Sequence, residues 1–92
     1  MLEREVEKHL VKVVKAAGGE IRKVSWGPMH RGAPDRFVMF PWGCCFIELK
    51  RPGQKAKPHQ EREHARMRRL GQKVLVLDSI EAIDEWMSNE HP

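Results

Sequence analysis

The sequence predicts an α/β domain in which helices flank a mixed central β-sheet. Its 92 residues suit one domain with one modest hydrophobic core. Its hydrophobic patterns occur in the order α-β-β-β-α-β-α. The run KVLVL at residues 73–77 is continuously apolar, as expected for a strand that is buried on both faces. A sheet with such a strand needs helices to cover it.

The first helix is expected over residues 2–17. Its apolar positions recur every three or four residues and form one hydrophobic face, made by Leu2, Val6, Leu10, Val13 and Ala17. Gly18 and Gly19 follow and end the helix, because glycine readily adopts the left-handed conformation found at helix C-termini.

Proline and glycine bound the remaining elements. Strands are expected at residues 20–26, 35–40, 44–50 and 73–77. Pro58 opens a helix that runs to Leu70. A last helix extends to about residue 89, with Asp78 or Ser79 as its N-terminal cap.

The second and third strands are expected to form a β-hairpin around a turn at Pro41–Gly43. With such a turn, facing residue numbers sum to about 84, which places Asp35 opposite Leu49. Glu48 and Lys50 flank Leu49 and share one face of their strand, because side chains alternate along a strand. An aspartate at the start of an apolar strand is unusual, since aspartate is depleted in strands.

Charge is unevenly distributed along the chain. The net charge is +4, and nine Lys or Arg residues lie between Lys50 and Lys73, against Glu61 and Glu63. Such a basic stretch is the electrostatic feature expected for a polyanion partner, although a solvated helix face produces the same pattern. No apolar run approaches the roughly 18 residues of a membrane span, and the charged N-terminus is unlike a secretory signal. We therefore expect a cytoplasmic protein without a membrane partner.

Cys44 and Cys45 are the two cysteines of the chain, and they are adjacent in sequence. Neighbouring cysteines without a second Cys/His pair make a poor zinc site. We expect both to pack as small apolar residues.

Two carboxylates and one lysine are expected to converge where the hairpin strands leave the core. Carboxylates as close as Asp35 and Glu48 repel each other unless a cation lies between them. Mg²⁺ takes one or two carboxylates and completes its shell with water and phosphate. Lys50 beside it could stabilise a phosphate or deprotonate a water. The combination suits phosphodiester hydrolysis, and the alternative is a structural ion cluster.

The motifs A-P-D and E-L-K resemble the P-D…(D/E)-x-K signature of the restriction-endonuclease-like nuclease superfamily. The longer stretches R-G-A-P-D-R, F-I-E-L-K-R-P-G and P-H-Q resemble its VRR-NUC (virus-type replication-repair nuclease) branch in particular. The similarity runs in one order from about residue 3 to residue 86. It implies a restriction-endonuclease-like core and a nuclease that depends on Mg²⁺ or Mn²⁺.

The resemblance assigns roles to individual residues. Asp35 and Glu48 match the metal-binding acids, Lys50 matches the catalytic lysine, and Leu49 could lend its backbone carbonyl to the metal. The family also has a glutamate on its first helix. Spacing compared with archaeal junction resolvases favours Glu7, while Glu3, one turn earlier, stays open.

Further residues are candidates for contact with DNA. Gln60 matches a glutamine of the branch that could touch water on the metal or the DNA backbone, or could simply make a hydrogen bond in the first helical turn. Phosphate contacts are expected from the basic loop, the following helix and the segment before Asp35. These candidates are Arg51, Lys55, Lys57, Arg62, Arg66, His30 and Arg31.

The leading functional hypothesis is a Mg²⁺- or Mn²⁺-dependent endonuclease that cuts branched DNA, with four-way (Holliday) junctions as the expected substrate. The chain resembles a nuclease domain alone, of the kind found in phages and bacteria. A two-fold homodimer would present two active sites to two symmetric strands. The alternatives are a nicking or flap-type nuclease without junction preference, and a non-catalytic DNA-binding module.

Overall fold

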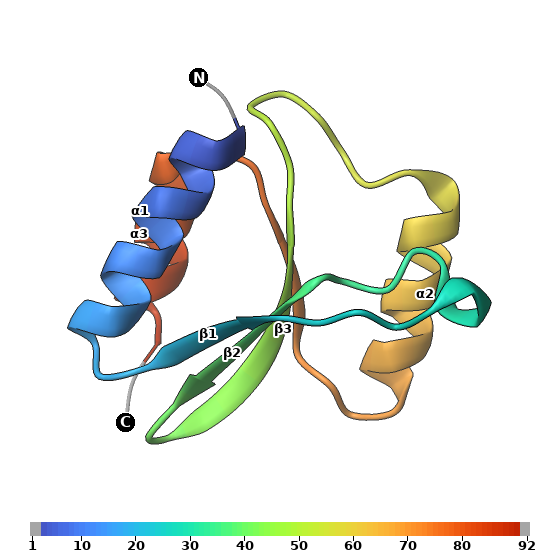
Figure 1. Cartoon of the computed structure of the whole chain (residues 1–92), viewed down its shortest axis with the longest axis horizontal. Coiled ribbons are helices and arrows are strands. Elements are labelled where there is room, and N and C mark those ends of the chain that lie inside the picture. The colour runs from blue at the N-terminus through green and yellow to red at the C-terminus, as the bar shows by residue number, and fades with distance from the viewer. Residues whose placement is uncertain (1–2, 91–92) are drawn as a thin grey trace.

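The computed structural model describes residues 3–90 and shows the predicted order of elements (Figure 1). The helices are α1 (Glu3–Ala16), α2 (Pro58–Arg69) and α3 (Ile80–Ser88). The strands are β1 (Glu20–Lys23), β2 (Arg36–Phe40), β3 (Gly43–Leu49) and β4 (Val74–Leu77). A 3-10 turn, η1 (Pro28–His30), lies within the loop between β1 and β2. The predicted helix start at residue 2 lies outside the described residues.

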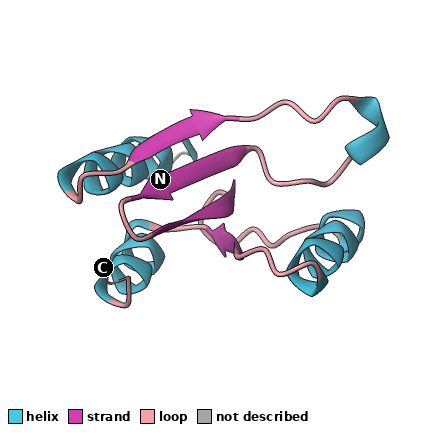
Figure 2. Ribbon diagram, turned by 90° about the horizontal axis from the view of Figure 1, so that it is seen from below, coloured by secondary structure: helices cyan, strands magenta, loops and turns pink. Residues whose placement is uncertain are grey.

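The four strands form one mixed sheet in the order β1-β2-β3-β4. The first three strands pair antiparallel, and β4 pairs parallel to β3. The parallel pair follows from the crossover through α2, because parallel neighbours need a long connection. Helices α1 and α3 lie side by side against one face of the sheet, and α2 lies on the other side (Figures 1 and 2). The predicted α/β class with a flanked mixed sheet is confirmed.

The register of the β2–β3 hairpin differs from the prediction by one residue. Phe40 faces Gly43, so the connection is Pro41 and Trp42 alone, and Gly43 belongs to β3. The register predicted from a three-residue turn, with Asp35 opposite Leu49, is therefore wrong. Continuing the observed ladder by one residue beyond Arg36 places Asp35 opposite Glu48. Partners across an antiparallel pair share a face, so the two carboxylates are on the same side of the sheet.

The main core lies between the sheet and the pair of helices α1 and α3. Helix α1 contributes a fully buried stripe, and β2, β3 and α3 close over it. Its largest members are Leu10, Ile47, Phe40, Ile83 and Trp86. A helix with one apolar stripe is stabilised mainly by packing of this kind rather than by its intrinsic propensity.

The cysteine prediction holds for one of the two residues. Cys45 is buried in the core, whereas Cys44 is exposed. The alternation of side chains in β3 explains the difference, since adjacent residues face opposite sides of the sheet.

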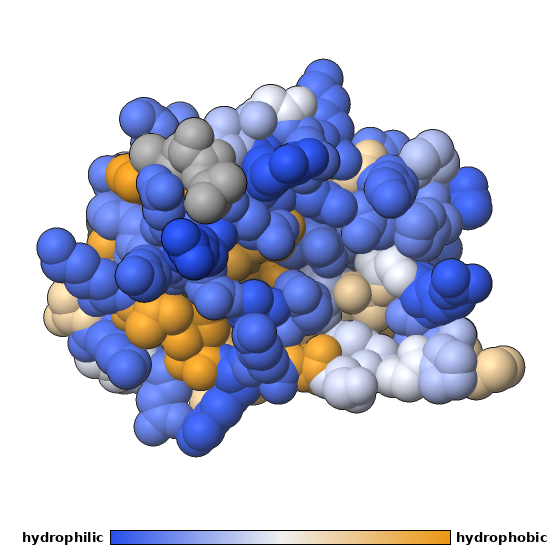
Figure 3. Space-filling model, turned by 45° about the horizontal axis from the view of Figure 1, so that its top comes forward, coloured by the Kyte–Doolittle hydropathy of each residue, from blue (hydrophilic) through white to orange (hydrophobic). Residues whose placement is uncertain are grey.

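Hydrophilic residues cover most of the molecular face shown in Figure 3, with a smaller apolar area between them. Over residues 3–90, no helix has the length and apolar character needed to cross a membrane.

Candidate active site

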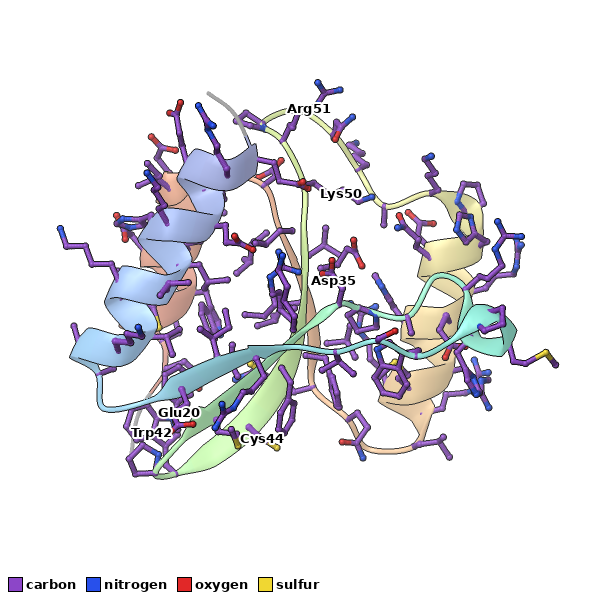
Figure 4. All side chains as sticks on the ribbon, viewed as in Figure 1. Glu20, Asp35, Trp42, Cys44, Lys50 and Arg51 are labelled. Atoms are coloured by element: carbon purple, nitrogen blue, oxygen red, sulfur yellow. The ribbon has the colours of Figure 1, made fainter. Side chains whose placement is uncertain are left out.

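Asp35, Glu48 and Lys50 come together on the side of the sheet that faces α2. Asp35 directly precedes β2, Glu48 is the penultimate residue of β3, and Lys50 directly follows β3. The amide of Lys50 donates to the Leu77 carbonyl at 3.0 Å, so hydrogen bonding to β4 continues through this residue. Figure 4 shows the labelled Asp35 and Lys50 side chains in the space between β3 and α2.

Glu48 is the electrostatic centre of this group. The residue is only 8% exposed, and its carboxylate lies 4.0 Å from Lys50 Nζ. Burial first, and then the charge of Asp35, raise the pKa of Glu48 to about 7, although Lys50 partly opposes both effects. A carboxyl group with this pKa is only partly ionised at neutral pH. The charge of Lys50 therefore does not fully offset the cost of burying the Glu48 carboxylate.

The oxygen atoms available here suit a hard divalent cation. Among residues 3–90, no three His, Cys, Asp or Glu side chains lie close enough to hold a metal. The candidate ligands are the carboxylates of Asp35 and Glu48 and the main-chain carbonyl of Leu49. So small a set suits Mg²⁺, which commonly uses few protein ligands. Phe46 and Lys50 donate their amides toward β4, so the carbonyl of Leu49 points the other way. The β2 ladder ends at Arg36, before it reaches Leu49.

The two candidate acids of α1 have different surroundings. Glu7 accepts a hydrogen bond from Arg36 Nε at 2.8 Å, and the same guanidinium lies 2.8 Å from Asp35 Oδ2. Glu3, one turn earlier, acts on Glu48 and raises the pKa of that residue. The carboxylate of Glu7 is therefore engaged by Arg36, and Glu3 is the acid of α1 whose charge reaches Glu48.

Sequence reasoning missed Arg36, which stands directly after the P-D motif. Its side chain is only 12% exposed and links Glu7 of α1 to Asp35. Its position on the α1 side of β2, next to two acids, could have been read from strand alternation once the register was known.

Gln60 lies in the first turn of α2, as predicted. Its Oε1 accepts a hydrogen bond from the Lys57 amide at 2.9 Å, which caps the helix. Pro58 at the first helical position supports the same start. Within residues 3–90 the side-chain N–H groups of Gln60 make no hydrogen bond, so they are available to a further partner.

The predicted DNA-contacting residues divide between two shallow depressions and an exposed loop. A depression of about 590 Å³ brings Arg31 together with three arginines of α2, which are Arg62, Arg66 and Arg69. A second depression, of about 630 Å³, includes Lys55. Arg51 and Lys57 are exposed in the loop before α2. His30 ends η1 beside Trp26, with ring centroids 6.4 Å apart. Arg69 was not among the sequence candidates.

The acidic pair with its lysine lies outside all three depressions described on the surface. It lies at the ends of the two inner strands, β2 and β3, where Asp35 is exposed and Glu48 is buried. Through the exposed carboxylate of Asp35 the site is accessible to the backbone of a long polymer, whereas a closed pocket would admit a small molecule.

A mixed sheet between helices, with an acidic pair and a lysine at the ends of neighbouring strands, defines the class as a nuclease of the restriction-endonuclease-like superfamily. A solved structure described as a VRR_NUC domain is similar to the chain, with a TM-score of 0.88, 36% identity and coverage of 97% of both chains. A protein described as "Putative nuclease p44", from Acyrthosiphon pisum secondary endosymbiont phage 1, is 50% identical over 78 residues. That similarity covers 84% of this chain and 83% of the phage protein. No family model matches the chain.

The particular family follows from these similarities. The chain belongs to the VRR-NUC family of nucleases.

Proposed function

We propose that this nuclease hydrolyses phosphodiester bonds in branched DNA with the help of Mg²⁺ or Mn²⁺. Asp35, Glu48 and the carbonyl of Leu49 would hold the ion. The observation that carries the proposal is the placement of two carboxylates on one face of the sheet, with Lys50 Nζ 4.0 Å from Glu48. The raised pKa of Glu48, caused first by burial and then by Asp35, marks a site where a cation would be stabilising.

The bound ion would supply Lewis acidity and lower the pKa of a nearby water. The chain supplies the positioning and the remaining charge. Lys50 directly follows β3 and is held by its amide hydrogen bond to β4. As an ammonium group its side chain would stabilise negative charge on the phosphate, and as a neutral amine it would accept a proton from water. Gln60 would donate its side-chain N–H to a phosphate oxygen or a water while its oxygen caps α2.

The acid of α1 would complete the site from the side opposite Gln60. Glu7 is the residue favoured by sequence spacing, and its release from Arg36 would be needed before it could act on the metal. Glu3 already raises the pKa of Glu48 and needs no such release. Parallel Glu3→Gln and Glu7→Gln variants would decide between them. Removing the charge of the acid that binds the metal should weaken Mn²⁺ binding, and removing the other charge should not.

The substrate would be bound mainly through phosphate charge. Arg31, Arg62, Arg66 and Arg69 surround one depression, and Arg51, Lys55 and Lys57 extend the positive charge along the loop before α2. Such contacts supply affinity without base specificity. Choice of substrate would then come from shape, with a homodimer presenting two sites to a four-way junction in the cytoplasm of a bacterial or phage-infected cell.

The test is a cleavage assay on labelled substrates with Mg²⁺, Mn²⁺ or EDTA. The substrates are a four-way junction, a flap, a splayed arm, a linear duplex and a single strand. We expect paired cuts in the junction with either metal and none with EDTA. Asp35→Ala should abolish cleavage, and Lys50→Ala should slow it by at least about 100-fold.

Other outcomes would replace parts of the proposal. Cutting of every substrate at similar rates would support a nicking or flap-type nuclease and remove the junction preference. Tight DNA binding without cleavage, unchanged by either substitution, would identify a non-catalytic binding module. Full cleavage in EDTA would exclude the role assigned to the metal.

A further inference from the structure

The segment of residues 24–35 that delivers Asp35 to the site is folded into a closed loop. The Val24 amide donates to the Asp35 carbonyl at 3.0 Å, which closes the loop at its base. The indole N–H of Trp26 donates to the Pro34 carbonyl at 2.7 Å. Pro34 itself is fully buried. We call residues 24–35 the Asp35 loop.

The Asp35 loop packs backbone to backbone against α2. Gly32 has a φ of +90°, and a Cβ atom added there would lie 2.9 Å from the His59 carbonyl oxygen and 3.1 Å from Gln60 Cα. Any side chain larger than hydrogen would therefore push the loop away from the helix. Gly27, in the same loop, has a φ of +77° but open space around it.

His64 lies one turn after Gln60 in α2 and is hydrogen-bonded to the backbone of Gly32. It is 1% exposed, and burial followed by the charge of Arg68 lowers its pKa, while a hydrogen bond to the Gly32 backbone opposes both. A bond that favours the protonated form is one in which the imidazole donates and the carbonyl accepts. The other ring nitrogen, Nε2, is buried without a hydrogen-bond partner among residues 3–90. A buried polar atom without a hydrogen-bond partner is destabilising, so the His64 ring is a costly choice for packing alone.

We propose that His64 is a positioning residue for the nuclease reaction. Its hydrogen bond and the close approach of Gly32 dock the Asp35 loop on α2, and this docking holds the Asp35 carboxylate on the face that carries Glu48. The inference rests on the proposed function, because it assigns His64 a role in placing a metal ligand. The histidine itself does not touch the substrate or the metal.

The orientation of a metal ligand by its supporting residues governs affinity. Loss of such a support commonly weakens metal binding by 10- to 100-fold. A residue that merely fills the core would be replaced by an apolar residue of similar size without that loss. The two roles therefore predict different results for His64→Leu.

The experiment measures Mn²⁺ affinity by isothermal titration calorimetry in variants that remain folded by circular dichroism. We expect His64→Leu and Gly32→Ala to weaken Mn²⁺ binding by about 10- to 100-fold. His64→Asn keeps an N–H donor and should recover part of the loss. Gly27→Ala imposes a similar positive-φ strain without the clash, and it should bind Mn²⁺ within about twofold of the wild type, since loss of the support for Asp35 would weaken binding far more.

A second readout requires no metal. Docking of the loop protects the Val24 amide, so hydrogen exchange at Val24 should be faster in His64→Leu and Gly32→Ala than in Gly27→Ala. Wild-type affinity and wild-type exchange in His64→Leu and Gly32→Ala would overturn the inference. Absence of Mn²⁺ binding in the wild type, or its persistence in Asp35→Ala, would instead reject the proposed metal site, and the exchange rates would still decide whether His64 docks the loop.

Discussion

The ionisation of Glu48 links the stability of the protein to the chemistry of its site. The carboxyl group is held in a buried position by β3, next to Asp35 and within 4.0 Å of Lys50. Its pKa of about 7 means that the folded, metal-free protein binds a proton there more tightly than the unfolded chain does. Stability from this group is therefore present below the unfolded pKa, near 4.5, and is lost as pH rises through about 7.

Substitution Glu48→Gln should remove this pH dependence. Because glutamine stays neutral, we expect the variant to be more stable than the wild type at pH 8 in EDTA, by on the order of 3 kcal/mol for a shift of this size. The two proteins should differ much less at pH 4. Urea unfolding at both pH values checks the prediction, and an equal difference at both would mean that Glu48 ionises normally.

At the scale of one element, α2 has two faces with different chemistry. His64 and Met67 are buried against the sheet, while Arg62, Arg66 and Arg69 are exposed. A 3.6-residue period places these two sets on opposite sides of one helix. One helix therefore carries both His64, the proposed support of the Asp35 loop, and the arginines of the proposed phosphate-binding surface.

The arginines of α2 should contribute to DNA affinity without sequence preference. The double variant Arg62→Gln, Arg69→Gln removes two exposed charges, so binding should weaken and the slope of log Kd against log salt should fall by about two. Lys15→Gln on α1, which is also exposed but lies on the far side of the sheet, is the control. An equal loss in the control would show that net charge, rather than this surface, governs binding.

The N-terminus of α3 has a single effective cap. The sequence left Asp78 and Ser79 as alternatives, and the structure shows the Ser79 hydroxyl accepting from the Ala82 amide at 3.0 Å. Ser79→Ala should lower the free energy of unfolding by about 1 kcal/mol. Asp78→Ala should change it by less. Thermal or urea unfolding of the two variants measures both losses, and a larger loss in Asp78→Ala would contradict the assignment of Ser79 as the cap.

At the scale of the whole molecule, the candidate site lies at the ends of the two inner strands of the sheet, β2 and β3. Helices α1 and α3 cover one face and α2 lies on the other (Figure 1), and Asp35 and Lys50 lie between β3 and α2 (Figure 4). Asp35 is exposed there, whereas the side chains of Glu48 and Lys50 are largely buried. The molecule measures 34 × 30 × 21 Å. One copy of this size spans about one turn of DNA, which is roughly 34 to 36 Å, so its size is consistent with the second copy proposed for a junction.

Mixing active and inactive subunits tests the homodimer. If two subunits cut the two strands of a junction, a mixed dimer of wild type and Asp35→Ala should cut one strand and release a nicked junction. The fraction of nicked product should peak at intermediate mixing ratios, because mixed dimers are then most abundant. A simple dilution of activity, with no accumulation of nicked junctions, would show that each subunit acts alone.

Much of the architecture was predictable because its signals are local. The apolar stripe of α1, the proline at the start of α2 and the continuous run of β4 each depend on residues a few positions apart. The hairpin was predictable too, but its register was not, since one glycine can belong to the turn or to the strand. Gly43 joined the strand, and this moved Asp35 from Leu49 to Glu48.

By itself, the sequence determined the order of elements, the mixed sheet and the two motifs that identify the family. Only the tertiary structure decided which side chains meet. It paired Glu7 with Arg36, brought the charge of Glu3 close enough to raise the pKa of Glu48, and hydrogen-bonded His64 to the backbone of Gly32. The physical reason is that periodicity selects a face of a helix or strand, whereas the partner across space depends on turn length and on the packing of elements far apart in the chain.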